Sequence, residues 1–258
     1  MNVPNFGPGT DPGVLREWAR IVEGLGFDLL MMSDHVTITP DVAVRYPEPF
    51  YEPFTTLSWL AGLTTTVKLG TTVLILPYRH PLLVSRMATN LNQLSGGRLV
   101  LGVGVGWARQ EFEALGVPFA ERGRLTDDYL ATLRDAGHTV WVGGNSEVGI
   151  RRAVKNGYPW HPLRGTLPWM ASVVAGHTLP GFVPRIALRL TTTPVDDPER
   201  LAGVGTLEQI LDDLDRLRQL GATSVVLDPY HGDPEETRSP QPAWRALTAV
   251  ATHWRNRT

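Results

Sequence analysis

The chain alternates short runs of consecutive apolar residues with longer segments in which apolar residues recur every three or four positions. A continuous apolar run is typical of a strand that is covered on both faces of a parallel sheet. A repeat of three to four positions is typical of an amphipathic helix. The runs that we interpret as strands are residues 2–6, 27–32, 69–76, 98–103, 139–142, 158–161, 185–190 and 224–227.

Between these runs, capping signals mark where helices begin. Asp11 precedes Pro12, and Thr206 begins the spelling Thr-Leu-Glu-Gln of a capping box. In the helix that begins near Pro81, we expect one face to contain Leu83, Met87, Leu91 and Leu94. The segments that we expect to be helical are 12–25, 55–65, 107–115, 125–134, 146–156 and 167–175, with further helices from Pro81, Thr206 and Ser239.

Eight rounds of strand and helix predict a single (β/α)8 barrel, the TIM barrel, as one domain over residues 1–258. A chain of 258 residues suits one such barrel, whose typical size is about 250 residues. The chain is 42% hydrophobic and 19% charged, which is an ordinary globular composition.

Charge and cysteine content narrow the partners and the chemistry. The net charge is −2 and no Lys/Arg cluster is present, so we expect neither nucleic acid nor a membrane surface as the main partner. No apolar stretch approaches the ~18–20 residues of a membrane span. The first residues do not resemble a signal peptide, and we expect a cytoplasmic protein. The absence of cysteine excludes thiolate nucleophiles and cysteine-based metal sites.

Asp34 and His35 directly follow an apolar strand. In a barrel of this kind the active site lies at the carboxyl ends of the strands. An imidazole beside a carboxylate suits proton transfer near neutral pH. The alternative is that Asp34 caps the following turn and that His35 faces solvent.

Two glycine-rich turns follow later strands. Gly102, Gly104 and Gly106 alternate after the fourth strand, and backbone N–H groups without side chains can approach an anion there. Gly143-Gly144-Asn145 leads into a helix N-terminus, which favours a phosphate group. The alternative is a tight turn in the first case and a helix cap in the second.

A proline-rich and aromatic loop runs from Tyr46 to Phe54. A loop of this length in a compact domain usually has a function or lacks order. We expect either a lid over a substrate or a loop packed down on the surface.

Histidine and aspartate residues also permit a metal-hydrolase interpretation. The candidate ligands are His35, His80, His161 and His231 with Asp34 and Asp228. The first strand carries no ligand, and no spacing such as H-E-x-x-H is present. We therefore predict no metal site.

Taken together in their order and spacing, seven motifs resemble the luciferase-like, F420-dependent oxidoreductase family over nearly the whole chain. They are Pro4-Asn5-Phe6-Gly7, Gly26-Phe27-Asp28 leading to Ser33-Asp34-His35, Leu69-Gly70-Thr71-Thr72-Val73-Leu74 with the later Arg79-His80-Pro81, Leu94-Ser95-Gly96-Gly97-Arg98, Leu101-Gly102-Val103-Gly104-Val105-Gly106-Trp107, Trp141-Val142-Gly143-Gly144-Asn145-Ser146 and Trp160-His161-Pro162.

The resemblance implies a cofactor and roles for these residues. The cofactor is expected to be the deazaflavin F420, with FMN as the alternative. His35 and Asp34 are the implied catalytic pair at the reactive edge of the ring, with His35 as the candidate proton donor. Thr72-Val73 is implied to be a bulge, often with a non-prolyl cis peptide, behind the ring. The implied cofactor-binding residues are Asp34, Thr72, Val73, Gly104, Val105, Gly106, Gly143, Gly144 and Asn145.

The implied activity is hydride transfer between F420 and a small organic substrate, and many such barrels form homodimers. With FMN, the family resemblance implies a monooxygenase instead. Members of the family usually have an insertion before the fifth strand, whereas only Asp135-Ala136-Gly137-His138 lie there in this chain. The short connection motivates a third alternative, a barrel that binds a flavin without turnover.

Overall fold

The computed structural model describes residues 1–255 and 257. The strands are β1 (Leu29–Met32), β2 (Lys68–Ile75), β3 (Leu99–Gly104), β4 (Val140–Gly143), β5 (Trp160–His161), β6 (Arg185–Ala187), β7 (Arg189–Leu190), β8 (Val204–Gly205) and β9 (Val226–Asp228). The α-helices are α1 (Pro12–Gly24), α2 (Pro40–Ala43), α3 (Pro53–Ala61), α4 (Pro81–Leu94), α5 (Arg109–Ala114), α6 (Arg122–Asp135), α7 (Glu147–Asn156), α8 (Leu167–Gly176), α9 (Leu207–Gln219) and α10 (Gln241–Trp254). Short 3₁₀ helices are η1 (Leu76–Tyr78), η2 (Phe119–Glu121) and η3 (Pro234–Arg238).

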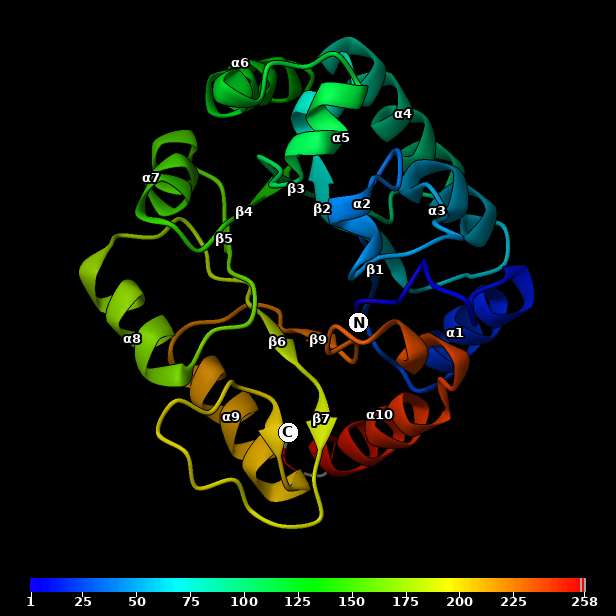
Figure 1. The fold of residues 1–258 in the computed structure, drawn as a ribbon. Coiled ribbons are helices and arrows are strands. Elements are labelled where there is room, and N and C mark those ends of the chain that lie inside the picture. Colours follow the sequence, from blue (N-terminus) through cyan, green and yellow to red (C-terminus); the bar gives the residue numbers. More distant parts are fainter. Residues whose placement is uncertain (256, 258) are drawn as a thin grey trace.

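Strands β1 to β6 and β9, together with the first residues of the chain, form a ring of parallel segments, and the larger helices surround it (Figure 1). Strands β1 to β5 pair in order, and β6 pairs with β9. Parallel bridges from Trp160 to Phe182 and from Leu163 to Arg185 join β5 to β6. The amide of Asn2 donates to the carbonyl of Leu227, and Asn2 forms a parallel bridge with Met31. The first residues therefore lie between β9 and β1 and complete the TIM barrel.

The carboxyl ends of the barrel strands face the N-termini of the helices that follow them, and hydrogen bonds cap several of these helices. Asp11 accepts from the amide of Val14 at the start of α1, as predicted. At α9, Thr206 and Gln209 form the predicted capping box. These caps satisfy backbone donors that a helix leaves unpaired in its first turn. They fix the direction in which each helix leaves the mouth of the barrel.

The predicted strands are confirmed in order, and most differ from the observed strands by one or two residues at an end. Two predicted strands differ further. Residues 185–190 divide into β6, which belongs to the ring, and β7, which pairs with β8 outside it. In the first strand, residue 2 pairs with β1, whereas Phe6 forms an antiparallel bridge with Phe50. The chain thus turns away from the ring before Phe6.

Only part of the face of α4 that contains Leu83, Met87, Leu91 and Leu94 is buried. The helix buries Val84, Ala88 and Leu91. Leu83 and Leu94 are 51% and 71% exposed. Two sets of apolar residues at helical spacing lie on this helix, and only contact with the barrel decides which set is buried.

The short connection between α6 and β4 forms a compact turn. The amide of His138 donates to the carbonyl of Leu133, and Gly137 has a φ of 79°. The ring Nε2 of His138 lies 3.2 Å from the hydroxyl of Ser85 on α4. The turn is thereby tied to the neighbouring helix.

Among the residues that the structure describes, no helix is long and apolar enough to cross a membrane.

The orientation of α4 predicts a contrast between two identical substitutions. Leu91 is 1% exposed, so Leu91→Ala leaves a cavity and costs about 2–5 kcal/mol of unfolding free energy. Leu94→Ala changes it by less than about 0.5 kcal/mol, because Leu94 is 71% exposed. Urea unfolding of the two variants measures both values. Equal losses would contradict the orientation of the helix.

Candidate functional site

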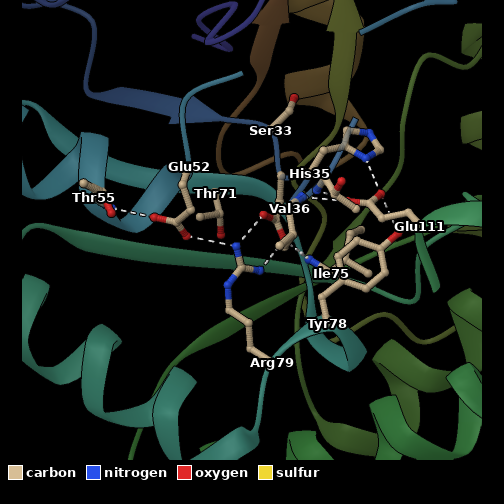
Figure 2. Close-up of polar contacts among 12 residues, drawn as sticks. Ser33, His35, Val36, Glu52, Thr55, Thr71, Ile75, Tyr78, Arg79 and Glu111 are labelled. Atoms are coloured by element: carbon tan, nitrogen blue, oxygen red, sulfur yellow. Dashed lines mark hydrogen bonds and ion pairs between the residues drawn. The ribbon is translucent and has the colours of Figure 1, made fainter. Parts of the chain in front are cut away.

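The carboxyl end of β1 carries Asp34 and His35 into the mouth of the barrel, and both are buried. They hold two separate networks there (Figure 2). Asp34 forms hydrogen bonds with residues at the end of β2 and just after it. His35 forms a hydrogen bond with a residue of α5, the helix that follows β3.

Asp34 is fully engaged by the protein. Its carboxylate accepts from the amide of Ile75 at 2.8 Å and from both terminal nitrogens of Arg79, each at 2.8 Å. The Asp34 side chain has 0% exposure. Arg79 also donates to Glu52 at 2.9 Å, and Glu52 caps α3 at Thr55. That Asp34 contacts the cofactor stays a prediction. Through Ile75 and Arg79, its carboxylate holds the end of β1 next to the end of β2.

His35 is held by Glu111, a residue that the sequence interpretation did not include. Nδ1 of His35 lies 2.6 Å from Oε2 of Glu111. The other oxygen of Glu111 accepts from the amides of Val36 and Thr37 at 2.6 and 3.1 Å. The hydroxyl of Tyr78 donates to Oε2 at 2.9 Å. Because Nδ1 faces a carboxylate, it carries a proton, and Nε2 is the atom left for a ligand.

The charge of Glu111 is stabilised by these donors. Burial alone would raise the pKa of Glu111, but the hydrogen bond and the charge of His35 and the amides of Val36 and Thr37 outweigh it and lower the pKa. Burial, followed by the charge of Glu111, raises the pKa of Tyr78, so its hydroxyl stays protonated and donates. A fixed carboxylate behind the imidazole sets its tautomer and orientation.

The aromatic loop lies over His35. Two of its rings, those of Tyr46 and Phe50, have centroids 5.4 and 5.3 Å from the imidazole centroid. The ring of the half-exposed Trp107 is 5.8 Å from the same centroid. The amide of Gly7 donates to the carbonyls of residues 47 and 49, so the loop is packed down on the first segment. The loop thus supplies an aromatic wall at the imidazole while being anchored at its base.

Thr72 and Val73 lie in the bulge of β2 where the register with β3 shifts, and the peptide between them is cis, as the resemblance implied. The carbonyl of Thr72 accepts from Arg185 at 2.5 Å. Its hydroxyl lies 2.8 Å from Nε2 of His161. Nδ1 of His161 is 2.5 Å from the carbonyl of Val183, so Nδ1 donates and Nε2 accepts.

Burial lowers the pKa of His161 to about 4, against the opposing hydrogen bond to the Val183 carbonyl. The imidazole is therefore neutral near pH 7 and orients the hydroxyl of Thr72. The hydroxyl and the carbonyl of Thr72 are therefore both held by other residues of the protein. The bulge presents the partly buried side chain of Val73 instead.

The predicted glycines of the first turn, together with Gly143 at the start of the second, make room for side chains of the barrel. A Cβ atom at Gly104 or Gly143 would lie 2.5 or 2.7 Å from a methyl group of Val73. One at Gly106, whose φ is 79°, would lie 2.7 Å from Ile75. Val105, between the two glycines, is partly buried. Close packing accounts for these glycines, and their contact with a cofactor stays a prediction.

The turn at Gly144 and Asn145 differs, because it is open. Gly144 has a φ of 139°, and a Cβ atom there would meet nothing nearer than Gly149 at 3.6 Å. The exposed Asn145 exchanges two hydrogen bonds with the backbone of Leu163, at 2.5 and 2.8 Å. Ser146 caps α7 by accepting from the amide of Gly149. Backbone at this helix N-terminus is accessible to an anion.

Sequence reasoning missed Glu111 and Arg185, and it assigned no role to Arg79, because each lies far along the chain from its partner. Glu111 is 76 residues from His35, and local periodicity carries no information about such a pair. The one available signal was a charged residue next to Phe112 on the apolar side of a short helix. Among the described residues, no group of three or more His, Cys, Asp or Glu side chains is arranged to hold a metal ion.

The sequence profile of the family described as luciferase-like monooxygenase matches residues 4–139 of this chain. A curated but uncharacterised protein of Mycobacterium tuberculosis is 31% identical over 128 residues, which are 45% of this chain and 44% of the relative. The match therefore spans under half the length of that relative. A second uncharacterised protein of the same organism is 27% identical over 244 residues, with 81% and 84% of the two chains covered.

Solved structures of similar fold use two different cofactors. The coenzyme F420 dependent tetrahydromethanopterin reductase of Methanopyrus kandleri has a TM-score of 0.72 at 14% identity and covers 100% of this chain and 98% of its own. The oxygenating constituent of 3,6-diketocamphane monooxygenase from Pseudomonas putida, in complex with FMN, has a TM-score of 0.73 at 15% identity, with 97% and 96% covered. At these identities the likeness establishes the fold alone.

The contact between His35 and Glu111 predicts a change of tautomer in Glu111→Gln. The amides of Val36 and Thr37 keep the side-chain oxygen in place, so the new NH2 group faces His35. Nδ1 must then accept, and the proton moves to Nε2. Nitrogen-15 NMR of the histidine side chains reports the tautomer.

Glu113→Gln is the matched control, because Glu113 is exposed on the same helix. It should leave the His35 tautomer unchanged. An unchanged tautomer in Glu111→Gln as well would show that Glu111 does not set the protonated nitrogen.

Proposed function

Because the chain belongs to the luciferase-like monooxygenase family, we propose that it is an oxidoreductase that uses the deazaflavin F420. Its reaction is hydride transfer between this cofactor and a small organic substrate. The observation that carries the proposal is the imidazole of His35, held through Nδ1 by the buried Glu111 at the mouth of the barrel. Its Nε2 is then the ring nitrogen left to exchange a proton with a ligand.

The residues at the mouth fit the two ends of a flavin-type cofactor. The bulge at Thr72-Val73, with its polar groups bound to Arg185 and His161, offers an apolar surface on which a flat ring can rest. The open turn at Gly144, at the N-terminus of α7, offers backbone donors to a phosphate. Glu147, in the first turn of α7, would repel a phosphate at this turn. Its Oε1, however, lies 3.6 Å from Nε of Arg151 and 3.5 Å from Nε2 of His177, and the charge of Arg151 reduces this repulsion.

When bound, a deazaflavin supplies or accepts a hydride, the equivalent of two electrons and a proton. Reduction of a carbonyl group also needs a proton on the oxygen, and oxidation of an alcohol releases one. His35 gives or takes this proton at Nε2, while Glu111 stabilises the imidazole when it is protonated. Tyr46, Phe50 and Trp107 limit the access of water to the imidazole.

FMN is the second candidate cofactor, and with it the reaction would be a monooxygenation. The description of the matching family and the FMN complex among structures of similar fold favour it. The same turn at Gly144 would hold the FMN phosphate. Binding measurements distinguish the two cofactors.

We also propose that the protein forms a homodimer through α3 and α4, which lie side by side on the outside of the barrel (Figure 1). Leu82, Leu83 and Leu94 on α4 are 65%, 51% and 71% exposed. Trp59 and Leu63, on or next to α3, are 36% and 46% exposed. Apolar side chains gathered on one outer face are typical of a protein interface.

Titration of the purified protein with F420 and, separately, with FMN tests the proposed cofactor. Cofactor fluorescence should show saturable binding of F420 that is tighter than that of FMN. Asn145→Asp adds a negative charge at the open turn but keeps an oxygen for the amide of Leu163. We expect it to weaken F420 binding about tenfold, through repulsion of the phosphate.

Asn90→Asp is the matched control, because Asn90 is exposed on the distant helix α4. It should bind F420 as the wild type does. Equal affinities of the two variants would exclude the turn as the phosphate site. Tight FMN binding without F420 binding would replace the proposal by the FMN-dependent reaction, and binding of neither would remove it.

The homodimer is tested by sedimentation of the wild type and of Leu83→Glu. A charge on the outer face of α4 should convert the dimer to a monomer, because burial of an unpaired carboxylate is costly. Leu190→Glu is the control, at a residue on β7 that is 42% exposed. A monomeric wild type at all concentrations would contradict the proposal.

A further inference from the structure

A second charged cluster lies at the mouth, at the carboxyl end of β9. Oδ2 of Asp228 accepts from Nε and a terminal nitrogen of Arg185, at 3.0 and 2.8 Å. It also accepts from Nε and a terminal nitrogen of Arg164, at 2.9 and 2.6 Å. Two guanidinium groups thus share one carboxylate whose side chain has 0% exposure.

The cluster carries one positive charge more than its carboxylate can neutralise. Arg185, which donates two hydrogen bonds to Asp228, would by itself neutralise this carboxylate. Arg185 also donates to the carbonyl of Thr72. Arg164 is the surplus cation, and its side chain is 24% exposed whereas that of Arg185 is 9% exposed. Among the described residues, Nη1 of Arg164 donates no hydrogen bond, whereas its Nε and Nη2 both donate to Asp228. Nη1 is thus the nitrogen of this guanidinium that is left to bind an anion.

The backbone at Arg164 is unusual. Its φ is 45°, and among the described residues it is the one residue other than glycine with a positive φ. Residues in this region are disfavoured by steric contact of Cβ and tend to occur at functional sites. The flanking Leu163 is bound to Asn145, and the amide of Arg164 donates to the carbonyl of Arg185 at 2.8 Å. The chain thus holds an unfavourable conformation that directs a second guanidinium to Asp228.

A cavity lies between β7, the segment after β9 and the start of α10, and its lining includes Leu188, whose amide donates to the carbonyl of Asp228. It has a volume of about 320 Å³, and its polar lining residues include Arg189, His231 and Glu236. Burial, then the charges of Arg164 and Arg189, lower the pKa of His231, so both cations approach one imidazole. Within the described part of the chain, Arg189 forms no ion pair.

The lining contains one carboxylate, Glu236, which can offset one of the two cations Arg164 and Arg189. Glu236 accepts from the amide of His231 at 2.7 Å. Burial, and then the charge of Asp233, raise the pKa of Glu236 against the hydrogen bond from the His231 amide and the charges of Arg189 and Arg164. The position after the seventh and eighth strands is also where barrels commonly bind phosphate groups.

We infer that Arg164, supported by Arg185 and Asp228 and flanked by Arg189, forms a subsite for an anionic group of a small-molecule ligand. The group is a carboxylate or a phosphate, for which a guanidinium is a suitable partner. Two ligands can supply it. One is the substrate, an identification that rests on the proposed function, and the other is the phosphate of the cofactor, since Leu163 joins this segment to Asn145.

Calorimetric titration with inorganic phosphate and with acetate tests the subsite. The full chain is used without cofactor, at constant ionic strength. The wild type should bind at least one anion saturably, and Arg164→Gln should weaken that binding about tenfold or more. Arg20→Gln is the control, because the Arg20 side chain is 71% exposed on α1 and pairs with Glu17. It should bind as the wild type does.

Asp228→Asn provides a second, independent variant. It leaves Arg164 and Arg185 without their carboxylate, so phosphate should bind it more tightly and raise its Tm more than that of the wild type. A merely structural cluster would lose stability in this variant without recovering it on addition of phosphate.

The proposal is overturned if the wild type binds neither anion, if Arg164→Gln binds as the wild type does, or if phosphate fails to stabilise Asp228→Asn. Repeating the titration with saturating F420 or FMN identifies the source. Retained anion binding assigns the subsite to the substrate, and displacement assigns it to the cofactor phosphate. Because the anion titration needs no cofactor, its failure leaves the cofactor titration unaffected, and the two proposals fail separately.

Discussion

Three buried carboxylates at the mouth of the barrel each need cationic or N–H partners, and the structure of the site follows from this requirement. Asp34, Glu111 and Asp228 are 3%, 0% and 0% exposed. A carboxylate removed from water is tolerated only when it is paired and hydrogen-bonded. Their partners come from other strands and loops, so each pairing fixes the relative position of segments that the chain brings together only at the mouth. The imidazole, the bulge and the aromatic loop take their positions from these pairings.

The barrel was predictable because it depends on local periodicity. Apolar runs at near-regular intervals predicted where the strands lie. Asp11 and Thr206 predicted helix starts that the structure confirms. The orientation of α4 was not predictable in this way. Leu91 and Leu94 both fit a helical repeat, and only the packing of α4 against its neighbours shows that Leu91 faces inward.

The site was predictable as a set of strand ends but not as a set of pairings. His35 and the bulge at Thr72-Val73 were found because they follow strands or carry a family motif. The role of a polar residue depends on partners distant in sequence. Asp34 illustrates this, since its carboxylate is bound on all sides by Arg79 and Ile75 and acts on the site through them. The partner that orients His35 lies on α5, which contains two glutamates, and the neighbouring Phe112 alone does not show which of them is buried.

The most direct test of this account is a crystal structure of the protein with F420 bound. The account predicts the ring against Val73, its phosphate at Gly144, and Nε2 of His35 facing the reactive edge while Nδ1 keeps its contact with Glu111. A cofactor bound elsewhere, or a His35 ring turned away from Glu111 in the complex, would contradict it.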